Sequence, residues 1–181
     1  MSRIHPIQIL LDEHSLIEQA LSALESALQR LKSGASAVTV VEKALHFLQD
    51  FADGPHMAKE EAVLFPLLKR KGLGAEAHAL MDEHRIAHQR LNAIARNLSD
   101  AVQNDGHALA FIRSQGRAYV ALMRNHIREE DETLFKLARQ VLTAEDINEL
   151  SPLFRTAEPP ALDAAILEEL QRFTRSLPGA A

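Results

Sequence analysis

The sequence predicts an all-α protein: an antiparallel up-down-up-down four-helix bundle built from two helical-hairpin repeats, with a C-terminal helical appendix. Three observations carry this prediction. The 181 residues are rich in the helix formers Ala, Leu, Glu, Gln and Arg, and only 4% are aromatic. Apolar residues recur at intervals of three and four, in a stripe that runs Leu10, His14, Ile17, Leu21, Leu24, Leu28, Leu31. Turn signals separate four such segments, and short turns join antiparallel neighbours in a bundle.

The first two helices form the first hairpin. One helix is expected from about 6 to 32, ended by Ser33-Gly34, and the next from about 36 to 70. We expect a kink at Gly54-Pro55, because proline cannot donate the backbone hydrogen bond of a helix interior, and a looser turn at Pro66. The sequence KGLG, residues 71–74, ends the second helix.

The second hairpin and the appendix follow. Helices are expected from about 75 to 103, closed by Asn104-Asp105-Gly106, and from about 107 to 140. The bundle domain is therefore assigned to residues 1–140. Residues 141–181 form the predicted extension, packed on or beside the bundle. It contains one helix behind a Thr143 cap and an amphipathic PALDAAILEELQRF after Pro159-Pro160.

The chain repeats itself at an offset of 70 residues. LLDEHSLIEQAL, residues 10–21, matches LMDEHRIAHQRL, residues 80–91, and HMAKEEAVLF at 56–65 matches HIREEDETLF at 126–135. Each hairpin thus carries a histidine on its first helix and a His-x-x-x-Glu on its second. Packing alone can produce repeats, but it does not require a polar residue at the same core position in each copy.

Composition excludes several classes of function. With 20 Lys+Arg against 25 Asp+Glu and no basic patch, nucleic acid is not an expected partner. The absence of cysteine excludes disulfides, thiolate metal sites and a cysteine nucleophile, and it suits a reducing cytosol. The first residues have no long apolar run before their charges, so we do not expect a signal peptide. No run of 18 uncharged apolar residues is present, so we expect a cytoplasmic protein without a membrane partner.

Seven polar residues fall in phase with the leucines on four helices: His14, His56, Glu60, His84, His88, His126 and Glu130. A single histidine such as His14 is more often a core residue satisfied by a backbone carbonyl. A buried carboxylate at Glu60, however, needs a partner or a metal, and the neighbouring Lys59 is expected to point elsewhere. The remaining histidines, His5, His46, His78 and His107, are expected at the surface.

Imidazoles combined with carboxylates suit iron, zinc, copper or manganese. Seven ligands are too many for one such ion, whereas two ions with bridging carboxylates fit the number. The chain has no Glu three residues before a His, which the ferritin-like carboxylate bundles use. It also has no HExxH, which removes the zinc-protease interpretation.

These residues resemble the ligand pattern of the hemerythrins, and KEEAVLFPLL and REEDETLFKLA resemble the bacterial HHE cation-binding branch of that family. The resemblance covers roughly residues 5 to 140. It implies a non-haem di-iron centre with an oxo or hydroxo bridge, and one open position where dioxygen would bind. The implied ligands are His84, His88 and His126 on one iron and His14 and His56 on the other, with Glu60 and a second carboxylate bridging.

Two carboxylates compete for the second bridge. Hemerythrins proper place an aspartate five residues after the last histidine, where this chain has Asp131, while the internal repeat pairs Glu60 with Glu130. In an α-helix a step of four residues returns to within about 40° of the histidine, whereas a step of five lands about 140° away. We favour Glu130 and keep Asp131 as the alternative.

The repeat differs at Glu18, which stands where the second hairpin has His88. One turn from His14, its carboxylate either points toward the open iron or lies in solvent, paired with a neighbour such as Arg90. In the first case it would favour ferric iron and fast autoxidation.

The sequence leads to three hypotheses. The favoured one is a di-iron protein that binds or reacts with dioxygen, peroxide or nitric oxide, with peroxide reactivity as a side activity and no dedicated turnover enzyme expected. The second is an iron-handling or iron-sensing protein with a labile centre. The third is a metal-independent helical interaction module.

Overall fold

The computed structural model describes residues 5–31, 35–156, 168, 172 and 175. Every regular element in these parts of the chain is helical, so the prediction of an all-α protein is confirmed. Across the same residues, no helix has both the length and the apolar character needed to cross a membrane.

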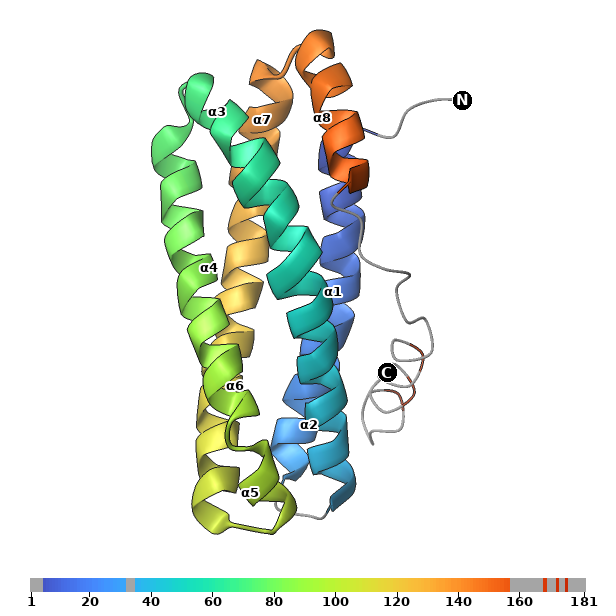
Figure 1. Ribbon diagram of the computed structural model, residues 1–181, viewed down its shortest axis with the longest axis vertical. Coiled ribbons are helices and arrows are strands. Elements are labelled where there is room, and N and C mark those ends of the chain that lie inside the picture. The colour runs from blue at the N-terminus through green and yellow to red at the C-terminus, as the bar shows by residue number, and fades with distance from the viewer. Residues whose placement is uncertain (1–4, 32–34, 157–167, 169–171, 173–174, 176–181) are drawn as a thin grey trace.

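Four helical segments lie side by side along the long axis, and successive segments run in opposite directions (Figure 1). The first is α1 (Pro6–Arg30), and the second consists of α2 (Ala35–Phe47), π-helical η1 (Leu48–His56), π-helical η2 (Lys59–Leu64) and α3 (Phe65–Arg70). The third consists of α4 (Gly74–Ala95) and α5 (Leu98–Val102). The fourth consists of α6 (Gly106–Glu129), π-helical η3 (Glu130–Leu134) and α7 (Phe135–Val141), and α8 (Ala144–Thr156) follows it. α1 packs against α2 and α6, and α4 packs against α6.

The turn predicted at Ser33-Gly34 lies outside the described residues, and the other two predicted turns lie where the sequence placed them, apart from one early break. Gly72 follows α3 with φ 93°, a conformation that glycine adopts without strain. The side chain of Asp105 caps α6 by accepting from the Ala108 amide at 2.8 Å. The third helix was expected to reach residue 103, but α4 ends at Ala95. There the Asn97 side chain donates to the Ala93 carbonyl at 2.9 Å, a bond that competes with the helical backbone.

The π-helical stretches were not predicted from the sequence. The kink expected at Gly54-Pro55 is present, since Gly54 has non-helical φ −100° and ψ −106° inside η1. η2 ends at Leu64, immediately before the turn that contains Pro66. η2 and η3 end at Leu64 and Leu134, which are 70 residues apart and match each other in the two copies of the sequence repeat. Short π-helical stretches inside α-helices are frequently found at functional sites.

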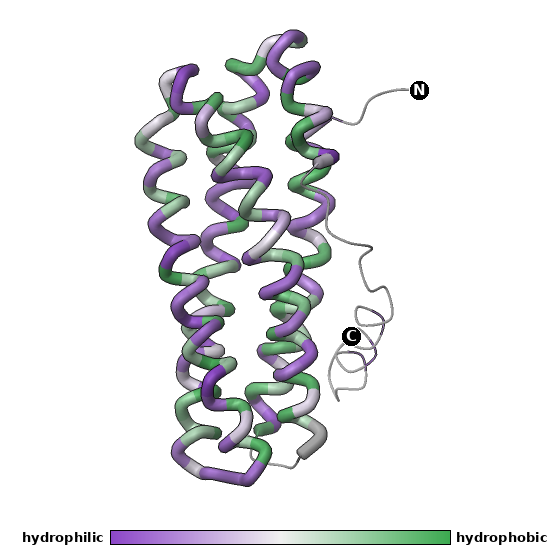
Figure 2. The backbone as a smooth tube through the Cα atoms, viewed as in Figure 1, coloured by the Kyte–Doolittle hydropathy of each residue, from purple (hydrophilic) through white to green (hydrophobic). Residues whose placement is uncertain are grey.

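Two hydrophobic clusters fill the interior, one toward each end of the long axis. The cluster near α8 includes Ile7, Leu10, Leu64, Phe65, Leu80, Leu134 and Phe135. The other includes Ile17, Leu21, Leu45, Leu48, Ala87, Leu91 and Met123. Hydrophilic and hydrophobic residues alternate along each long helix (Figure 2). On each of the four segments a polar stretch separates residues of the two clusters, and this level contains the candidate site.

The helix α8 lies against the end of the bundle segments, in contact with α1 and η2. Leu150 and Phe154 are buried in the cluster near α8. The predicted Thr143 cap is present, since its hydroxyl accepts from the Asp146 amide at 3.2 Å, and Lys71 pairs with the Asp146 carboxylate at 2.7 Å. The helix predicted after Pro159-Pro160 falls largely outside the described residues.

If α8 is part of the fold, Phe154→Ala will lower the free energy of unfolding by about 3–5 kcal/mol, because it empties a fully buried aromatic site. Leu153→Ala is the matched control, since Leu153 is 49% exposed, and it should change stability by less than about 0.5 kcal/mol. Urea unfolding followed by circular dichroism measures both. Equal, small losses would show that α8 does not dock.

Candidate metal centre

Four buried histidines meet at the polar level, one from each helical segment. They are His14 of α1, His56 at the end of η1, His84 of α4 and His126 of α6, each no more than 2% exposed. The rings of His14 and His56 are 4.8 Å apart, and those of His84 and His126 are 4.6 Å apart. The Nε2 atoms of His84 and His126 approach within 2.9 Å, so these nitrogens face the same small space.

Two glutamates lie between the histidine pairs. The Oε1 atom of Glu60 is 3.5 Å from His56 Nε2, and its Oε2 atom is 3.4 Å from His84 Nε2. Glu130 Oε2 is 3.2 Å from His14 Nε2 and 3.3 Å from His126 Nε2. Each carboxylate therefore reaches one histidine of each pair, which is the arrangement of a bridging group.

The carboxylate oxygens of these glutamates lack donors. Both oxygens of Glu60, both oxygens of Glu130 and the Nε2 atom of His14 are buried without a hydrogen-bond partner among the described residues. Buried polar groups are almost always paired, and an unpaired buried carboxylate is especially costly. A cation among these atoms would supply the missing partner.

The ligand atoms form two groups that share both carboxylates, and within each group they lie within 4.8 Å of one another. We call these groups the His14/His56 subsite and the His84/His126 subsite. Each offers two imidazole nitrogens and two carboxylate oxygens. That donor set suits a first-row transition metal, so the residues present fit two ions of this kind.

Each histidine is oriented by a further carboxylate on its other nitrogen. The Nδ1 atoms of His14 and His84 lie 2.7 Å from Asp131 and Glu61, and those of His56 and His126 lie 2.9 Å from Glu13 and Glu83. An Nδ1–H that donates to a carboxylate leaves the lone pair on Nε2, and it makes that nitrogen a better metal donor. All four lone pairs then face the centre. We call Glu13, Glu61, Glu83 and Asp131 the outer carboxylates.

Aromatic rings pack against two of the four histidines, His14 and His84. His14 stacks on Phe135 with the planes 11° apart, and His84 stacks on Phe65 with the planes 15° apart. The two phenylalanines stand 70 positions apart in the chain, as do the two histidines. The same spacing relates Glu13 to Glu83 and Glu61 to Asp131. The sequence repeat therefore extends beyond the innermost residues to the groups that orient them.

The chain matches the family described as Hemerythrin HHE cation binding domain over residues 5–138. It belongs to the hemerythrin HHE family. It is also 23% identical over 158 residues to uncharacterized proteins of Mycobacterium bovis and of two strains of Mycobacterium tuberculosis. The match covers 82% of this chain and 59% of each relative, so the chain spans about three-fifths of the length of the curated relatives that it matches.

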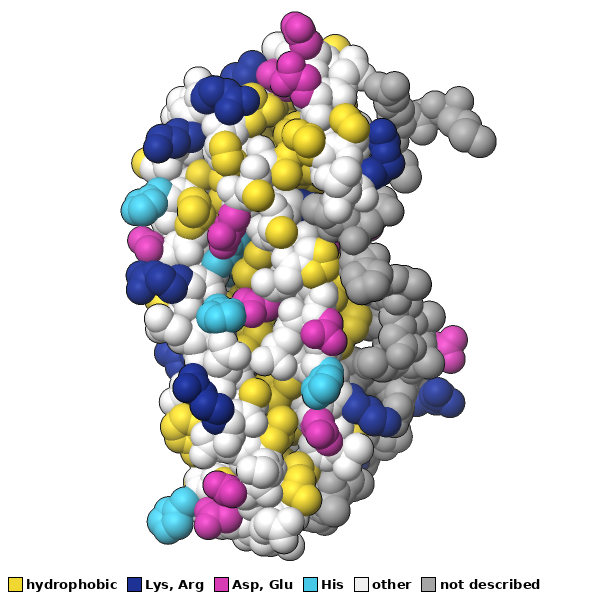
Figure 3. Space-filling model, in the orientation of Figure 1, with side chains coloured by type: hydrophobic (Ala, Val, Ile, Leu, Met, Phe, Trp, Pro, Cys, Tyr) yellow, Lys and Arg dark blue, Asp and Glu magenta, His cyan; other side chains and the backbone are white. Residues whose placement is uncertain are grey.

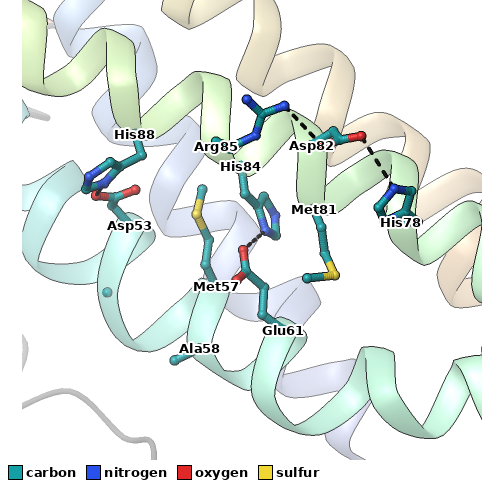
Figure 4. A pocket seen from close by; sticks show the side chains of 11 residues that line it. Asp53, Met57, Ala58, Glu61, His78, Met81, Asp82, His84, Arg85 and His88 are labelled. Atoms are coloured by element: carbon teal, nitrogen blue, oxygen red, sulfur yellow. Dashed lines mark hydrogen bonds and ion pairs between the residues drawn. The ribbon is translucent and has the colours of Figure 1, made fainter.

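His88, which helical phase and the resemblance to hemerythrins both placed among the ligands, is not brought to the centre of this HHE domain. Its side chain is 58% exposed, and its Nδ1 atom lies 2.5 Å from Asp53 of η1. Asn92 contacts its Nε2 atom at 2.8 Å (Figure 4 shows the His88–Asp53 pair). These two contacts keep the ring at the surface, although His88 follows His84 by one helical turn.

The two candidates for the second bridging carboxylate take different places. Glu130 belongs to both groups of ligand atoms, while Asp131 binds the outer nitrogen of His14 and its side chain is 33% exposed. Both residues belong to the π-helical η3. The comparison of four-residue and five-residue steps after His126 assumed α-helical geometry and did not include a π-helical turn.

Glu18 does not reach the centre. Its carboxylate accepts from Arg124 Nε at 3.4 Å, and its side chain is 38% exposed. Glu18 therefore forms a partly solvated ion pair, the second of the two alternatives, but its partner is Arg124 and not Arg90. The guanidinium of Arg90 donates to Gln115. As expected, His46, His78 and His107 are exposed; His5 is half-buried and caps α1.

Sequence reasoning missed Lys59 and the outer carboxylates Glu13, Glu61 and Glu83. Lys59 is fully buried, and its ammonium group contacts Glu13 rather than Glu60. The sequence did contain a signal for the outer carboxylates. Each of them, like Asp131, is adjacent in sequence to a ligand residue, and a carboxylate stands at the same place in the other copy of the repeat. No comparable signal marks Lys59, since its counterpart in the second copy is Glu129, which is exposed.

A surface pocket leads toward His84. It has a volume of about 520 Å³ and lies between α4 and the η1–η2 region, with Glu61, Met57 and Met81 in its wall (Figure 4). On the face drawn in Figure 3, histidine and acidic side chains reach the surface near the middle of the molecule. Glu61, 40% exposed, lies between His84 and the solvent.

In the metal-free centre, burial and mutual repulsion control the protons. Burial, and then the neighbouring Glu130, raise the pKa of Glu60 well above its ordinary value. Burial would lower the pKa of His14, but its hydrogen bond to Asp131 and the nearby carboxylate of Glu130 outweigh this and raise it to about 9. Burial and the other three imidazoles, with Lys59, lower the pKa of His56. Metal ligands bind deprotonated, so ions must displace the protons of Glu60 and His14.

Glu60→Gln is expected to stabilise the metal-free protein at pH 7.5 by roughly 1–3 kcal/mol. The folded-state pKa of Glu60 is raised, so its contribution to stability is fully present below its ordinary pKa and is lost as the pH rises through the raised value. Glutamine has no proton to lose, so the advantage over the parent should vanish toward pH 4.5. Urea unfolding of both proteins at the two pH values measures it.

Glu130→Gln is the matched control at the equivalent position. Burial opposes ionisation of Glu130, but His126 and His14 hold its pKa below the ordinary value, so this substitution should destabilise the metal-free protein at pH 7.5. Destabilisation by both substitutions would contradict the proposed charge distribution.

Proposed function

We propose that this HHE domain holds two iron ions in a non-haem di-iron centre that binds or reacts with dioxygen, peroxide or nitric oxide. One observation carries the proposal: Glu60 and Glu130 each reach one histidine of both subsites, and all four of their oxygens are buried without a donor. Two cations that share these carboxylates would satisfy every one of the unpaired oxygens.

The donor set favours iron over the alternatives. Two histidines with carboxylates, and with positions left for a further ligand, are typical of non-haem iron that handles dioxygen, whereas the thiolates that favour zinc or copper(I) are absent. When bound, an iron pair supplies the electrons that bind or reduce a small oxidant.

The protein's own residues have three tasks in this proposal. The four histidines and two glutamates hold the ions, the outer carboxylates fix the imidazole tautomers, and the hydrophobic clusters on either side exclude bulk water. We also propose that the two helical hairpins are equivalent halves of one antiparallel four-helix bundle over residues 1–140. Each half would then supply two histidines and one bridging glutamate.

A second candidate function is iron handling, in which the centre gives up its ions to other molecules. The pocket that reaches Glu61 and His84 supports it, because it brings solvent next to one subsite. A metal-independent interaction module is less well supported, because it leaves the buried oxygens of Glu60 and Glu130 without a partner. A cytoplasmic location, suited to a cysteine-free chain, stays a prediction.

Pure protein supplied with ferrous iron under anaerobic conditions should bind two irons per chain, and His56→Ala and His126→Ala should each abolish binding of at least one. Each variant should also lose thermal stability in the metal-loaded form more than in the metal-free form, because a ligand that binds the folded state stabilises it by mass action. Iron analysis and melting curves measure these effects. His78→Ala, at an exposed position, is the control. Two irons in both variants would refute the site.

The reactivity is tested by exposing the reduced, iron-loaded protein in turn to dioxygen, peroxide and nitric oxide under an optical spectrometer. Spectral changes that require two bound irons support the proposal. Iron that a mild chelator removes within the same period, with no such changes, supports iron handling instead.

Glu130→Gln should disrupt the two-iron centre, while Asp131→Asn should retain two irons per chain. The first removes a carboxylate that both subsites share. The second leaves an amide oxygen that can still accept from His14, at a cost in affinity of about tenfold to a hundredfold at most. Iron stoichiometry and the optical spectrum separate the two variants, and the reverse result would assign the bridge to Asp131.

A further inference from the structure

Lys59 is a fully buried cation beside the candidate metal centre. Its side chain is 0% exposed, and its Nζ atom lies 2.5 Å from Glu13 Oε1. The other carboxylate oxygen of Glu13 is 2.9 Å from Nδ1 of His56. Glu13 is therefore shared between an ammonium group and a histidine of the His14/His56 subsite.

The other three outer carboxylates have no such cation. Glu61, Glu83 and Asp131 are 28–40% exposed, and within the described part of the chain no lysine or arginine pairs with any of them. The counterpart of Lys59 in the second copy of the repeat is Glu129, an exposed residue. The positive charge at Lys59 thus breaks an otherwise matched set of orienting contacts.

We propose that Lys59 makes the two subsites unequal by weakening cation binding at the His14/His56 subsite, so that this subsite fills second and loses its ion first. The proposal rests on the proposed two-metal function and names the residue that controls the order of occupancy. Lys59 acts as a positioning residue through Glu13 and His56 rather than as a ligand.

Two physical effects act in the same direction. Lys59 draws the charge of Glu13 away from the His56 N–H, and an outer carboxylate that is less available makes its imidazole a weaker donor. The ammonium group also repels a nearby cation, and burial leaves this repulsion poorly screened. The His84/His126 subsite, with Glu61 and Glu83 unshared, escapes the first effect entirely.

A purely structural role predicts a different result. If Lys59 only ties Glu13 in place, its loss should let Glu13 move, orient His56 less well and weaken the same subsite. The sign of the change in metal affinity therefore distinguishes the two roles.

The test is a titration with Co²⁺, which does not oxidise during the measurement, followed by visible absorption and calorimetry. The His126→Ala variant keeps only the His14/His56 subsite intact, and the His56→Ala variant keeps only the His84/His126 subsite intact. Each of these two variants is titrated with and without the additional substitution Lys59→Met. Single-subsite backgrounds remove the repulsion between two bound ions. We expect Lys59→Met to tighten Co²⁺ binding about tenfold or more in the His126→Ala background, and by a much smaller factor in the His56→Ala background.

Two further variants complete the experiment. Lys136→Met removes one charge from an exposed position on α7 and should change neither affinity. Lys59→Gln removes the charge but keeps a polar donor, and it replaces Lys59→Met if circular dichroism shows that the methionine variant is unfolded. In the protein with both subsites intact, the second Co²⁺ should bind more tightly after either Lys59 substitution.

Equal changes in the two backgrounds, no change, or weaker binding in the His126→Ala background would overturn the inference while leaving the two-metal centre in place. A parent protein that binds no Co²⁺ and no iron would instead refute the proposed function, and the inference with it.

Discussion

The burial of two carboxylates without hydrogen-bond donors is the constraint on which the rest of this structure depends. Glu60 and Glu130 lie at the middle of a helical protein, between two hydrophobic clusters that would otherwise form one core. A fold selected for stability alone would replace them with apolar residues, because burying unpaired charge is costly. Their burial, with four imidazoles aimed at the same space, supports the proposal that cations complete this site.

The surroundings of the centre are organised to present lone pairs. Hydrogen bonds from Nδ1 to the outer carboxylates fix the tautomers, and stacking on Phe65 and Phe135 fixes two of the rings. The same arrangement controls protons in the absence of metal, when burial raises the pKa of Glu60 above its ordinary value and contacts with Asp131 and Glu130 raise that of His14 to about 9. In the proposed function, metal uptake would therefore exchange protons for ions at a site that is already shaped.

Helix phase and the internal repeat were enough to predict the all-α fold. Of the seven residues selected in this way, six meet at the centre: His14, His56, Glu60, His84, His126 and Glu130. Helical phase gives the direction of the Cα–Cβ bond, but it does not give the hydrogen-bond or ion-pair partner toward which a long side chain turns. For this reason His88 and Glu18 lie away from the centre. His88 pairs with Asp53, and Glu18 pairs with Arg124. The π-helical turns were not predictable either, because they depend on tertiary contacts.

The two copies of the repeat agree at the residues that form the candidate metal centre. They differ in charged residues nearby, so the surroundings of the two subsites are not the same. The agreeing positions include every residue of the two subsites and every outer carboxylate. The differing ones include Lys59 opposite Glu129 and Glu18 opposite His88, and all four lie outside the ligand groups. Ligands that are shared by two ions cannot change without loss of both sites, whereas neighbouring charges can change one site at a time. The positions one step outside the ligands are therefore where a duplicated metal centre can acquire two different halves.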